Sequence, residues 1–436
     1  MAKLWFASLF TLGIIASLVF GLVMAVMLYT DAVNIWFAFA LTLVFNVVMW
    51  LIGPFITDFA NRFFYKVEFL TEEQVAKKYP AIASIIKKVS SEYKFPFPKF
   101  GIIADKNPTA FTYGSARFNS RIVVTEGLFH FLDTKEQEAV IAHELGHIVN
   151  RDFIVMMIAS TLVQFMYEIY AVLIRAKGKR AGNAKIIALG AYVFYIFGIY
   201  LLLFLSRTRE YLADTFSAKL TSPQTLSNAL IKVAYGIVAA DDDDRSKRLL
   251  ASTRHLGIMD VQNAKHYGIS SYVSNQDPKV LAEVMVFDKV NPWAKIAELS
   301  STHPLTGNRI DHLSDLSKEL GEKFSFDVDG AIARMKIDWG RMYGSFALNF
   351  LFWILPFALG LGAFLFLPIT WVPAAIGIGL LLRVPYRYSF SSPQKTTVIE
   401  QMRDPYASPV RGKAIQLEGK VIGRGVPGYI FGKVSL

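Results

Sequence analysis

The chain of 436 residues is 53% hydrophobic and only 19% charged, and its mean hydropathy is +0.37. This composition excludes a disordered protein and an ordinary soluble domain, and the chain is too long for a single domain. The net charge of +11 favours contact with an anionic membrane surface over contact with nucleic acid, and the lack of cysteine excludes disulfides and thiolate metal ligands.

Six apolar stretches approach the length of about 20 residues that an α-helix needs to cross a membrane. They come in pairs, which predicts three membrane hairpins, over residues 1–56, 153–206 and 344–384. The hydrophilic blocks between and after the hairpins cover residues 57–152, 207–343 and 385–436. Because each hairpin crosses the membrane twice, all three blocks are expected on one side. The first stretch is too long, and is followed too soon by the second, to be a cleaved signal peptide.

Positive charge predicts the orientation. Many Lys and Arg residues flank the spans on the side of the hydrophilic blocks, whereas two of the three opposite turns contain none. The positive-inside rule therefore predicts a multi-pass protein of the plasma membrane with its hydrophilic blocks in the cytoplasm. The connector at residues 175–185 conflicts with this prediction, because its five cations would lie outside. Either the second hairpin is only partly inserted or the rule is broken there.

The first hydrophilic block is predicted to combine helices with short strands. Residues 71–93 have the pattern of a helix, and residues 100–103 and 121–125 are predicted to be extended. Asp133 and Glu136 have the spacing of an N-terminal capping box, which predicts that a helix begins there.

The later blocks predict further helices and a β-rich tail. Residues 209–220 and 223–240 have helical patterns, and the charged run at residues 241–248 is expected to form a solvated loop. Residues 385–436 are rich in Gly, Pro and β-branched side chains. We therefore expect a mostly α-helical integral membrane protein that ends in a small β unit, with extended segments at residues 413–417 and 420–422.

The strongest chemical signal is the run His143-Glu144-Leu145-Gly146-His147. On a helix, residues four apart share one face, so both imidazoles can reach one metal ion while Glu144 points at its open side. The alternative is a surface helix with two solvated histidines.

A catalytic zinc site needs a third protein ligand, which in a chain without cysteine must be His, Glu or Asp. Glu210 and Asp214 are again four residues apart, so one carboxylate could bind the metal while the other orients a ligating imidazole. The alternative is an exposed acidic pair that balances Arg207 and Arg209. The intervening hydrophobic hairpin would bring Glu210 back to the histidines. Asp152, which precedes that hairpin, is expected to pair with a neighbouring Arg or to cap backbone groups near the membrane surface.

The motif HELGH, a following hydrophobic pair, SRTREYLAD at residues 206–214 and STHPLTGNRI at residues 301–310 together resemble the M48 family of membrane zinc metalloproteases. The resemblance is closest to its HtpX-like quality-control endopeptidases, and CAAX prenyl endopeptidases are related members. It covers roughly residues 1–320 and leaves out the tail.

The resemblance implies a gluzincin site, in which His143, His147 and Glu210 hold one Zn²⁺ and Glu144 is the catalytic base. It also implies a mostly helical catalytic domain with a small β-sheet whose edge strand lies over the zinc cleft. That strand corresponds to Thr109, Ala110, Phe111, Thr112 and Tyr113, with Thr109 where the family usually has Asn. An extended substrate can add to such an edge by backbone hydrogen bonds whatever the side chain.

His303 and Arg309 match a His-Pro motif that the family follows with an Arg. This match implies a cationic or hydrogen-bonding group near the developing oxyanion or the product carboxylate. The alternative for His303 is a loop histidine packed beside Pro304.

The leading hypothesis is a membrane zinc endopeptidase that cleaves damaged or misfolded membrane proteins. Its expected partners are polypeptide substrates and the lipid bilayer, with no nucleic acid, and it could be an oligomer. One alternative is a CAAX-type processing protease, which would need a lipid-accommodating chamber that is usually built from more spans. Another is a catalytically idle membrane scaffold, against which the intact HExxH motif and Glu210 argue.

Overall fold

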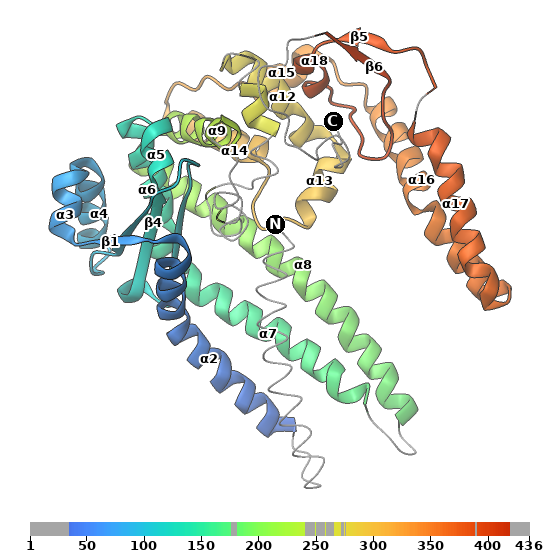
Figure 1. The fold of residues 1–436 in the computed structure, drawn as a ribbon, viewed down its shortest axis with the longest axis horizontal. Helices are drawn as coiled ribbons and strands as arrows, with labels where there is room; N and C mark the ends of the chain where they lie inside the picture. The colour runs from blue at the N-terminus through green and yellow to red at the C-terminus, as the bar shows by residue number, and fades with distance from the viewer. Residues whose placement is uncertain are drawn as a thin grey trace. The chain divides into compact units, whose positions relative to one another are not determined.

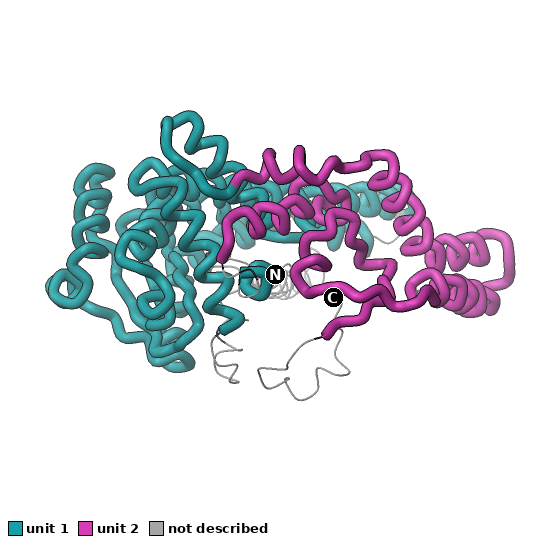
Figure 2. Tube along the Cα trace, turned by 90° about the horizontal axis from the view of Figure 1, so that it is seen from above, with its two compact units in different colours: residues 1–272, 297–326 teal, residues 273–296, 327–436 magenta. Residues whose placement is uncertain are grey.

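The structure is a computed structural model that describes residues 35–175, 181–239, 249, 258, 266–271, 274, 276–388 and 390–418. Two compact units divide the chain (Figure 2). Unit 1 comprises residues 1–272 and 297–326, and unit 2 comprises residues 273–296 and 327–436. The chain is mostly helical, which confirms the predicted fold class.

Unit 1 contains one small sheet among many helices. Its helices are α2 (Ile35–Ala60), α3 (Glu72–Lys78), α4 (Pro80–Glu92), α5 (Glu126–Phe131), α6 (Thr134–Val149), α7 (Asp152–Leu173), α8 (Ala181–Leu220), α9 (Pro223–Ala239) and α14 (Thr306–Leu320), with a π-helical turn at Asn61–Tyr65 and a 3₁₀ turn at Arg117–Asn119. Its strands are β1 (Glu68–Leu70), β2 (Lys99–Ile103), β3 (Ala110–Gly114) and β4 (Ser120–Thr125).

Unit 2 contains a helical hairpin and the second sheet. Its helices are α12 (Pro278–Val290), α15 (Val328–Met335), α16 (Trp339–Phe366), α17 (Val372–Arg387) and α18 (Val398–Met402), with a 3₁₀ turn at Ile369–Trp371. Helix α13 (Pro292–Leu299) contains residues of both units. Strands β5 (Gln394–Thr396) and β6 (Ile415–Leu417) pair in parallel. The tail thus contains a small β unit as predicted, although residues 420–422 lie outside the described part.

Five of the described helices are long and apolar enough to cross a membrane: α2, α7, α8, α16 and α17. The chain is therefore a multi-pass membrane protein. In unit 1, α7 packs against both α2 and α8, and the three helices run away from the sheet (Figure 1). In unit 2, α16 continues through Pro356, ends before Pro368 and packs against α17. The first predicted span lies outside the described residues.

Two predicted helices have different bounds in the structure. The helix expected over residues 71–93 is divided into α3 and α4 at Tyr79-Pro80, where Tyr79 has φ −136° and ψ 67°. Proline disfavours the helical conformation in the residue before it and lacks an N–H group, so Pro80 begins a new helix. The helix expected to begin at Arg209 is instead the last part of the 40-residue helix α8. No Pro or Gly interrupts residues 199–220, so nothing in this stretch ends the helix.

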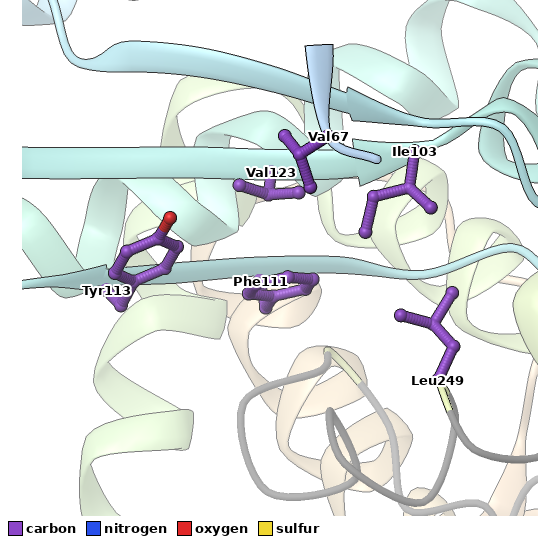
Figure 3. Packing of buried hydrophobic residues seen from close by; sticks show 6 residues of the cluster. All are labelled: Val67, Ile103, Phe111, Tyr113, Val123 and Leu249. Carbon is purple, nitrogen blue, oxygen red and sulfur yellow. The ribbon is translucent and has the colours of Figure 1, made fainter. Parts of the chain in front are cut away.

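The sheet of unit 1 has the strand order β1-β2-β4-β3, with β2 and β4 parallel and the outer pairs antiparallel. The two predicted extended segments are confirmed as β2 and β4, and β3 lies at an edge. One face of this sheet packs into a core of six buried residues, namely Val67, Ile103, Phe111, Tyr113, Val123 and Leu249 (Figure 3). Side chains alternate along a strand, so Ala110 and Thr112 point to the opposite face. Helix α6 packs against β3.

A buried ion pair fastens membrane helix α2 to this sheet. The Arg121 side chain on β4 is fully buried, and its Nε and Nη2 atoms donate to the Asp58 carboxylate at 2.9 to 3.1 Å. The Tyr113 hydroxyl on β3 donates to Asp58 Oδ1 at 2.8 Å and accepts from Asn61 Nδ2 at 3.2 Å. The last turn of α2 is therefore joined to the edge strand β3 and to its neighbour β4.

Replacing Asp58 tests this connection. The substitution Asp58→Ala would leave the Arg121 guanidinium buried without a counter-charge, and we expect it to lower the free energy of unfolding by about 3 kcal/mol. Lys99→Ala is the matched control, because Lys99 lies 3.5 Å from the same carboxylate but is 56% exposed. We expect the control to cost less than about 1 kcal/mol. Thermal unfolding of the full chain in detergent measures both, and equal shifts would contradict the prediction.

Candidate metal centre

Helix α6 places both histidines of the HExxH motif on one face, with their imidazole Nε2 atoms close together. The predicted capping box is confirmed, since Asp133 accepts from the Glu136 N–H and Glu136 accepts from the Asp133 N–H. The helix then continues for four turns without a break, so His143 and His147 share a face. Their Nε2 atoms lie 3.3 Å apart. His143 and Glu144 are buried, at 0% and 1% exposed, which excludes the alternative of solvated surface histidines.

Glu210 on α8 completes a group of three potential ligands. Its carboxylate oxygens lie 3.6 Å from His143 Nε2 and 3.7 Å from His147 Nε2. One ligand atom from each of His143, His147 and Glu210 falls within 4.8 Å of the others. The alternative of an exposed acidic pair fails, because Glu210 and Asp214 are both buried.

The spacing of these atoms fits a single metal ion. Two ligands that each lie about 2.1 Å from one ion at a tetrahedral angle are roughly 3.4 Å apart, which agrees with the separations above. In the described part of the chain, Glu210 Oε2 and both Glu144 carboxylate oxygens are buried without a hydrogen-bond partner. Buried carboxylate oxygens without partners are costly, and a metal ion with its coordinated water would satisfy them.

Glycine at the fourth position of HELGH allows α6 and α8 to approach closely. A Cβ atom on Gly146 would lie 3.0 Å from the Ala213 Cα and 3.3 Å from the Ala213 Cβ and carbonyl oxygen. This contact lies between the turn of α6 that bears the histidines and the turn of α8 that bears Glu210. The separation of the two backbones therefore sets how far the Glu210 carboxylate reaches toward the imidazoles.

Asp214 contacts the Nδ1 atom of His143, and Arg309 holds Asp214 in place. Asp214 Oδ1 lies 3.0 Å from His143 Nδ1, and the Arg309 guanidinium donates to the Asp214 carboxylate through Nε at 2.8 Å and Nη2 at 2.5 Å. Burial alone would lower the pKa of His143 and of Arg309, but their carboxylate neighbours raise both. Arg309 is 1% exposed and its Nη1 lies 3.9 Å from Glu210 Oε2. The Arg309 guanidinium thus contacts Asp214 more closely than it contacts Glu210.

Asp152 contacts the second imidazole in the same way. Its Oδ2 lies 2.7 Å from His147 Nδ1, and its Oδ1 contacts the Arg209 guanidinium. The predicted pairing of Asp152 with an arginine is confirmed, but the sequence reasoning missed its contact with His147. The available signal was its position five residues beyond His147, just after the helix ends.

His303 lies beside the carboxylate of Glu210. Its Nε2 is 3.5 Å from Glu210 Oε1, and its Nδ1 is 3.1 Å from the Thr302 hydroxyl. The loop that carries His303 is held by Arg207, whose Nη1 donates to the backbone oxygens of Glu298 and Ser301 at 2.8 and 2.9 Å. The imidazole therefore faces the ligand group.

Glu144 lies between the ligands and the edge strand. Burial raises the pKa of its carboxyl above the usual value, against the opposing effect of the two imidazoles and of Thr112 on β3. Along β3, Thr109 and Phe111 pair with β4, so the backbone groups of Ala110 and Thr112 face the edge away from β4. At this edge the Ile258 N–H donates to the Ala110 oxygen at 3.1 Å. Of the expected edge residues, Ala110 to Tyr113 belong to β3 and Thr109 precedes it.

Gly146→Ala tests the contact between α6 and α8. We expect the added methyl group to push α8 outward, to lower the stability by roughly 1–3 kcal/mol and to reduce the metal content per chain. Gly190→Ala on α8 is the matched control, because a Cβ there meets nothing within 4 Å. Elemental analysis and thermal unfolding measure the two effects, and full metal content in Gly146→Ala would contradict the prediction.

Comparisons with known proteins identify the family of this chain. A model described as Peptidase family M48 matches residues 76–317. A Protease HtpX homolog of Thermoplasma acidophilum is 30% identical over 309 residues, which cover 68% of this chain and 92% of the relative. A Protease HtpX homolog of Thermococcus sibiricus is 27% identical over 326 residues, which cover 72% and 97%. The crystal structure of S. mikatae Ste24p aligns over 72% of this chain and 67% of its own, at 19% identity and a TM-score of 0.43.

The family match covers more than half of the chain, and it includes both histidines of α6 and Glu210 on α8. A metalloprotease family implies a metal ion, and these three residues are the described group that could hold it. This chain therefore belongs to peptidase family M48, as an HtpX-like membrane metalloprotease that acts on polypeptides.

Proposed function

We propose that this protein is a zinc-dependent endopeptidase that hydrolyses peptide bonds of damaged or misfolded membrane proteins in protein quality control. One observation carries the proposal: two imidazoles and a carboxylate converge within 4.8 Å, with Glu144 directly beside them. Two nitrogen ligands and one oxygen ligand, with no thiolate, are the donor set of catalytic zinc sites that keep a fourth position open.

A zinc ion held by His143, His147 and Glu210 would supply Lewis acidity, polarising the scissile carbonyl and activating water. Glu144 takes the proton of the attacking water and passes it to the leaving amine. Its raised pKa suits this role, because a base works best when its pKa lies nearer to the working pH. No covalent intermediate with the protein is needed.

We assign different roles to His303 and Arg309. The Nε2 atom of His303 faces the ligand group, which supports a role as a hydrogen-bond donor to the oxyanion that forms on the substrate. The guanidinium of Arg309 is engaged by Asp214, which supports a positioning role through the Asp214–His143 contact. Of these two residues, only His303 is therefore assigned a contact with the substrate.

The edge of β3 away from β4 is the proposed site for the substrate backbone. The Ala110 oxygen at this edge accepts from the Ile258 N–H, so the Thr112 backbone groups are the ones proposed to pair with substrate, and Thr112 lies next to Glu144. An extended peptide that adds there by main-chain hydrogen bonds would lie beside the catalytic base. This mode reads backbone rather than side chains, which suits a protease that acts on many unfolded segments.

The position of the site supports membrane proteins as substrates. His147 lies five residues before the first residue of membrane helix α7, and Glu210 lies on the same helix as the apolar part of α8, five residues beyond Leu205. Five helical residues span about 8 Å. Peptide bonds close to the membrane surface are therefore within reach. The flanking Lys and Arg residues support a cytoplasmic site in the plasma membrane, against the five cations at residues 175–185.

Substitution of Glu144 separates catalysis from metal binding. We expect Glu144→Gln to keep the metal ion and to lower peptide cleavage by about 1,000-fold, because the ligands remain and the base is lost. His143→Ala, His147→Ala and Glu210→Ala should lose the metal ion as well. Zinc analysis and self-cleavage of the full chain in detergent measure both properties. Undiminished cleavage by purified Glu144→Gln would remove Glu144 from its role.

Substrate assays separate the proposed function from its alternatives. We expect wild-type enzyme to cleave casein and unfolded membrane proteins, and phenanthroline to abolish the cleavage by removing zinc. A catalytically idle scaffold would show no cleavage in any of these assays. Preferential cleavage of a farnesylated CAAX peptide over casein would instead establish a prenyl-protein processing enzyme.

A further inference from the structure

We infer that Asp152 and Arg209 are positioning residues for the metal ligand His147, so that the base of the membrane hairpin α7–α8 forms part of the metal centre. The inference rests on the proposed zinc function, because it concerns how strongly that ion is held. It adds two residues to those that the sequence motifs identify.

The contact with Asp152 fixes the orientation of the His147 ring. The 2.7 Å separation between Asp152 Oδ2 and His147 Nδ1 is that of a strong hydrogen bond to an ionised group. When a carboxylate holds Nδ1–H, the lone pair remains on Nε2, which here faces His143 Nε2 at 3.3 Å. The ring is thus presented as a metal ligand before any ion arrives.

Arg209 holds the Asp152 carboxylate in turn. Its guanidinium contacts Asp152 Oδ1 and donates to the Asn150 backbone oxygen at 3.2 Å. Asn150 is the residue that ends α6. Asp152 and Arg209 are 7% exposed, so water screens their interaction only weakly. Arg209 therefore links the end of α6, the start of α7 and the turn of α8 that carries Glu210.

The backbone between α6 and α7 has an unusual conformation that brings these groups together. Arg151 has φ 58° and ψ 39°, a left-handed conformation that non-glycine residues rarely adopt. It allows only Asn150 and Arg151 to separate the two helices, and it turns Asp152 back toward His147. Such a conformation persists when the surrounding contacts determine it, and here those contacts include Asp152 with His147 and with Arg209.

The two imidazoles consequently have equivalent support. His143 contacts Asp214, which in turn contacts Arg309. His147 contacts Asp152, which in turn contacts Arg209. The first set joins α6 to α8 and α14. The second set joins α6 to the two helices of the hairpin at their ends nearest the catalytic domain. A change in how α7 packs on α8 would therefore alter the orientation of His147.

The test is the zinc affinity of the full chain in detergent, measured by competition with a metal-buffering chelator. We expect Asp152→Asn to raise the dissociation constant for Zn²⁺ by about 10-fold to 100-fold, and Arg209→Gln to raise it by about 10-fold, as losses of such partners typically do. Substitution with Co²⁺ adds a second readout, because the visible absorption of bound Co²⁺ reports ligand geometry. We expect the Co²⁺ spectrum of Asp152→Asn to differ from that of the wild type.

Asp58→Asn is the matched control, because it removes a carboxylate from another buried arginine pair in unit 1, away from the metal ligands. We expect it to lower stability and to leave the zinc dissociation constant and the Co²⁺ spectrum unchanged. Arg151→Gly should also keep the zinc affinity, because glycine adopts the left-handed conformation readily.

The outcomes separate this inference from the proposed function. If Asp152→Asn and Arg209→Gln both bind Zn²⁺ within threefold of the wild type while His147→Ala loses it, the positioning role is wrong and the zinc site stands. If the wild-type chain itself does not bind Zn²⁺, the proposed function fails first. If Asp152→Asn does not fold, Arg209→Gln alone decides, since its unchanged affinity and spectrum would overturn the inference.

Discussion

The close approach of α6 and α8 at Gly146 and Ala213 is the constraint on which the candidate metal centre depends. The three proposed metal ligands come from these two helices, and neither helix carries all three. A ligand group built from separate elements holds its geometry only when the backbones between them have a fixed separation. A Cβ atom on Gly146 would lie 3.0 Å from the Ala213 Cα, so it would require a shift of a few tenths of an ångström between the two backbones. The ion pairs of Asp214 and Asp152 then fix the rotation of each imidazole once the helices are in place.

Local features of the site were accessible from the sequence. His143 and His147 share a helical face because of their spacing alone, and the same holds for Glu210 and Asp214. The capping box at Asp133 could also be read directly, because it involves side chains only three residues apart. The resemblance to family M48 added the assignment of Glu210 as a ligand, and the comparisons confirm the family.

Features that depend on tertiary contacts could not be predicted in the same way. The proposed role of Asp152 depends on the left-handed backbone conformation of Arg151. An arginine in the sequence does not predict that conformation. The fastening of α2 to the sheet by Asp58 and Arg121 joins residues 63 positions apart. The division of the predicted helix at Pro80 could have been predicted from the chemistry of proline. The helical pattern on both sides of Pro80 instead led to the prediction of one continuous helix. The placement of Arg309 behind Asp214 follows from the path of α14, which the sequence does not reveal.

The uninterrupted course of α8 has a mechanical consequence. A single 40-residue helix carries exposed apolar side chains such as Phe194 and Phe197 in one part and Glu210 in another. Membrane helices tilt to match the thickness of the surrounding hydrocarbon. If α8 tilts as one piece, Glu210 moves together with the apolar part of the helix, so bilayer thickness would act on the distance between the Glu210 carboxylate and the imidazoles of α6.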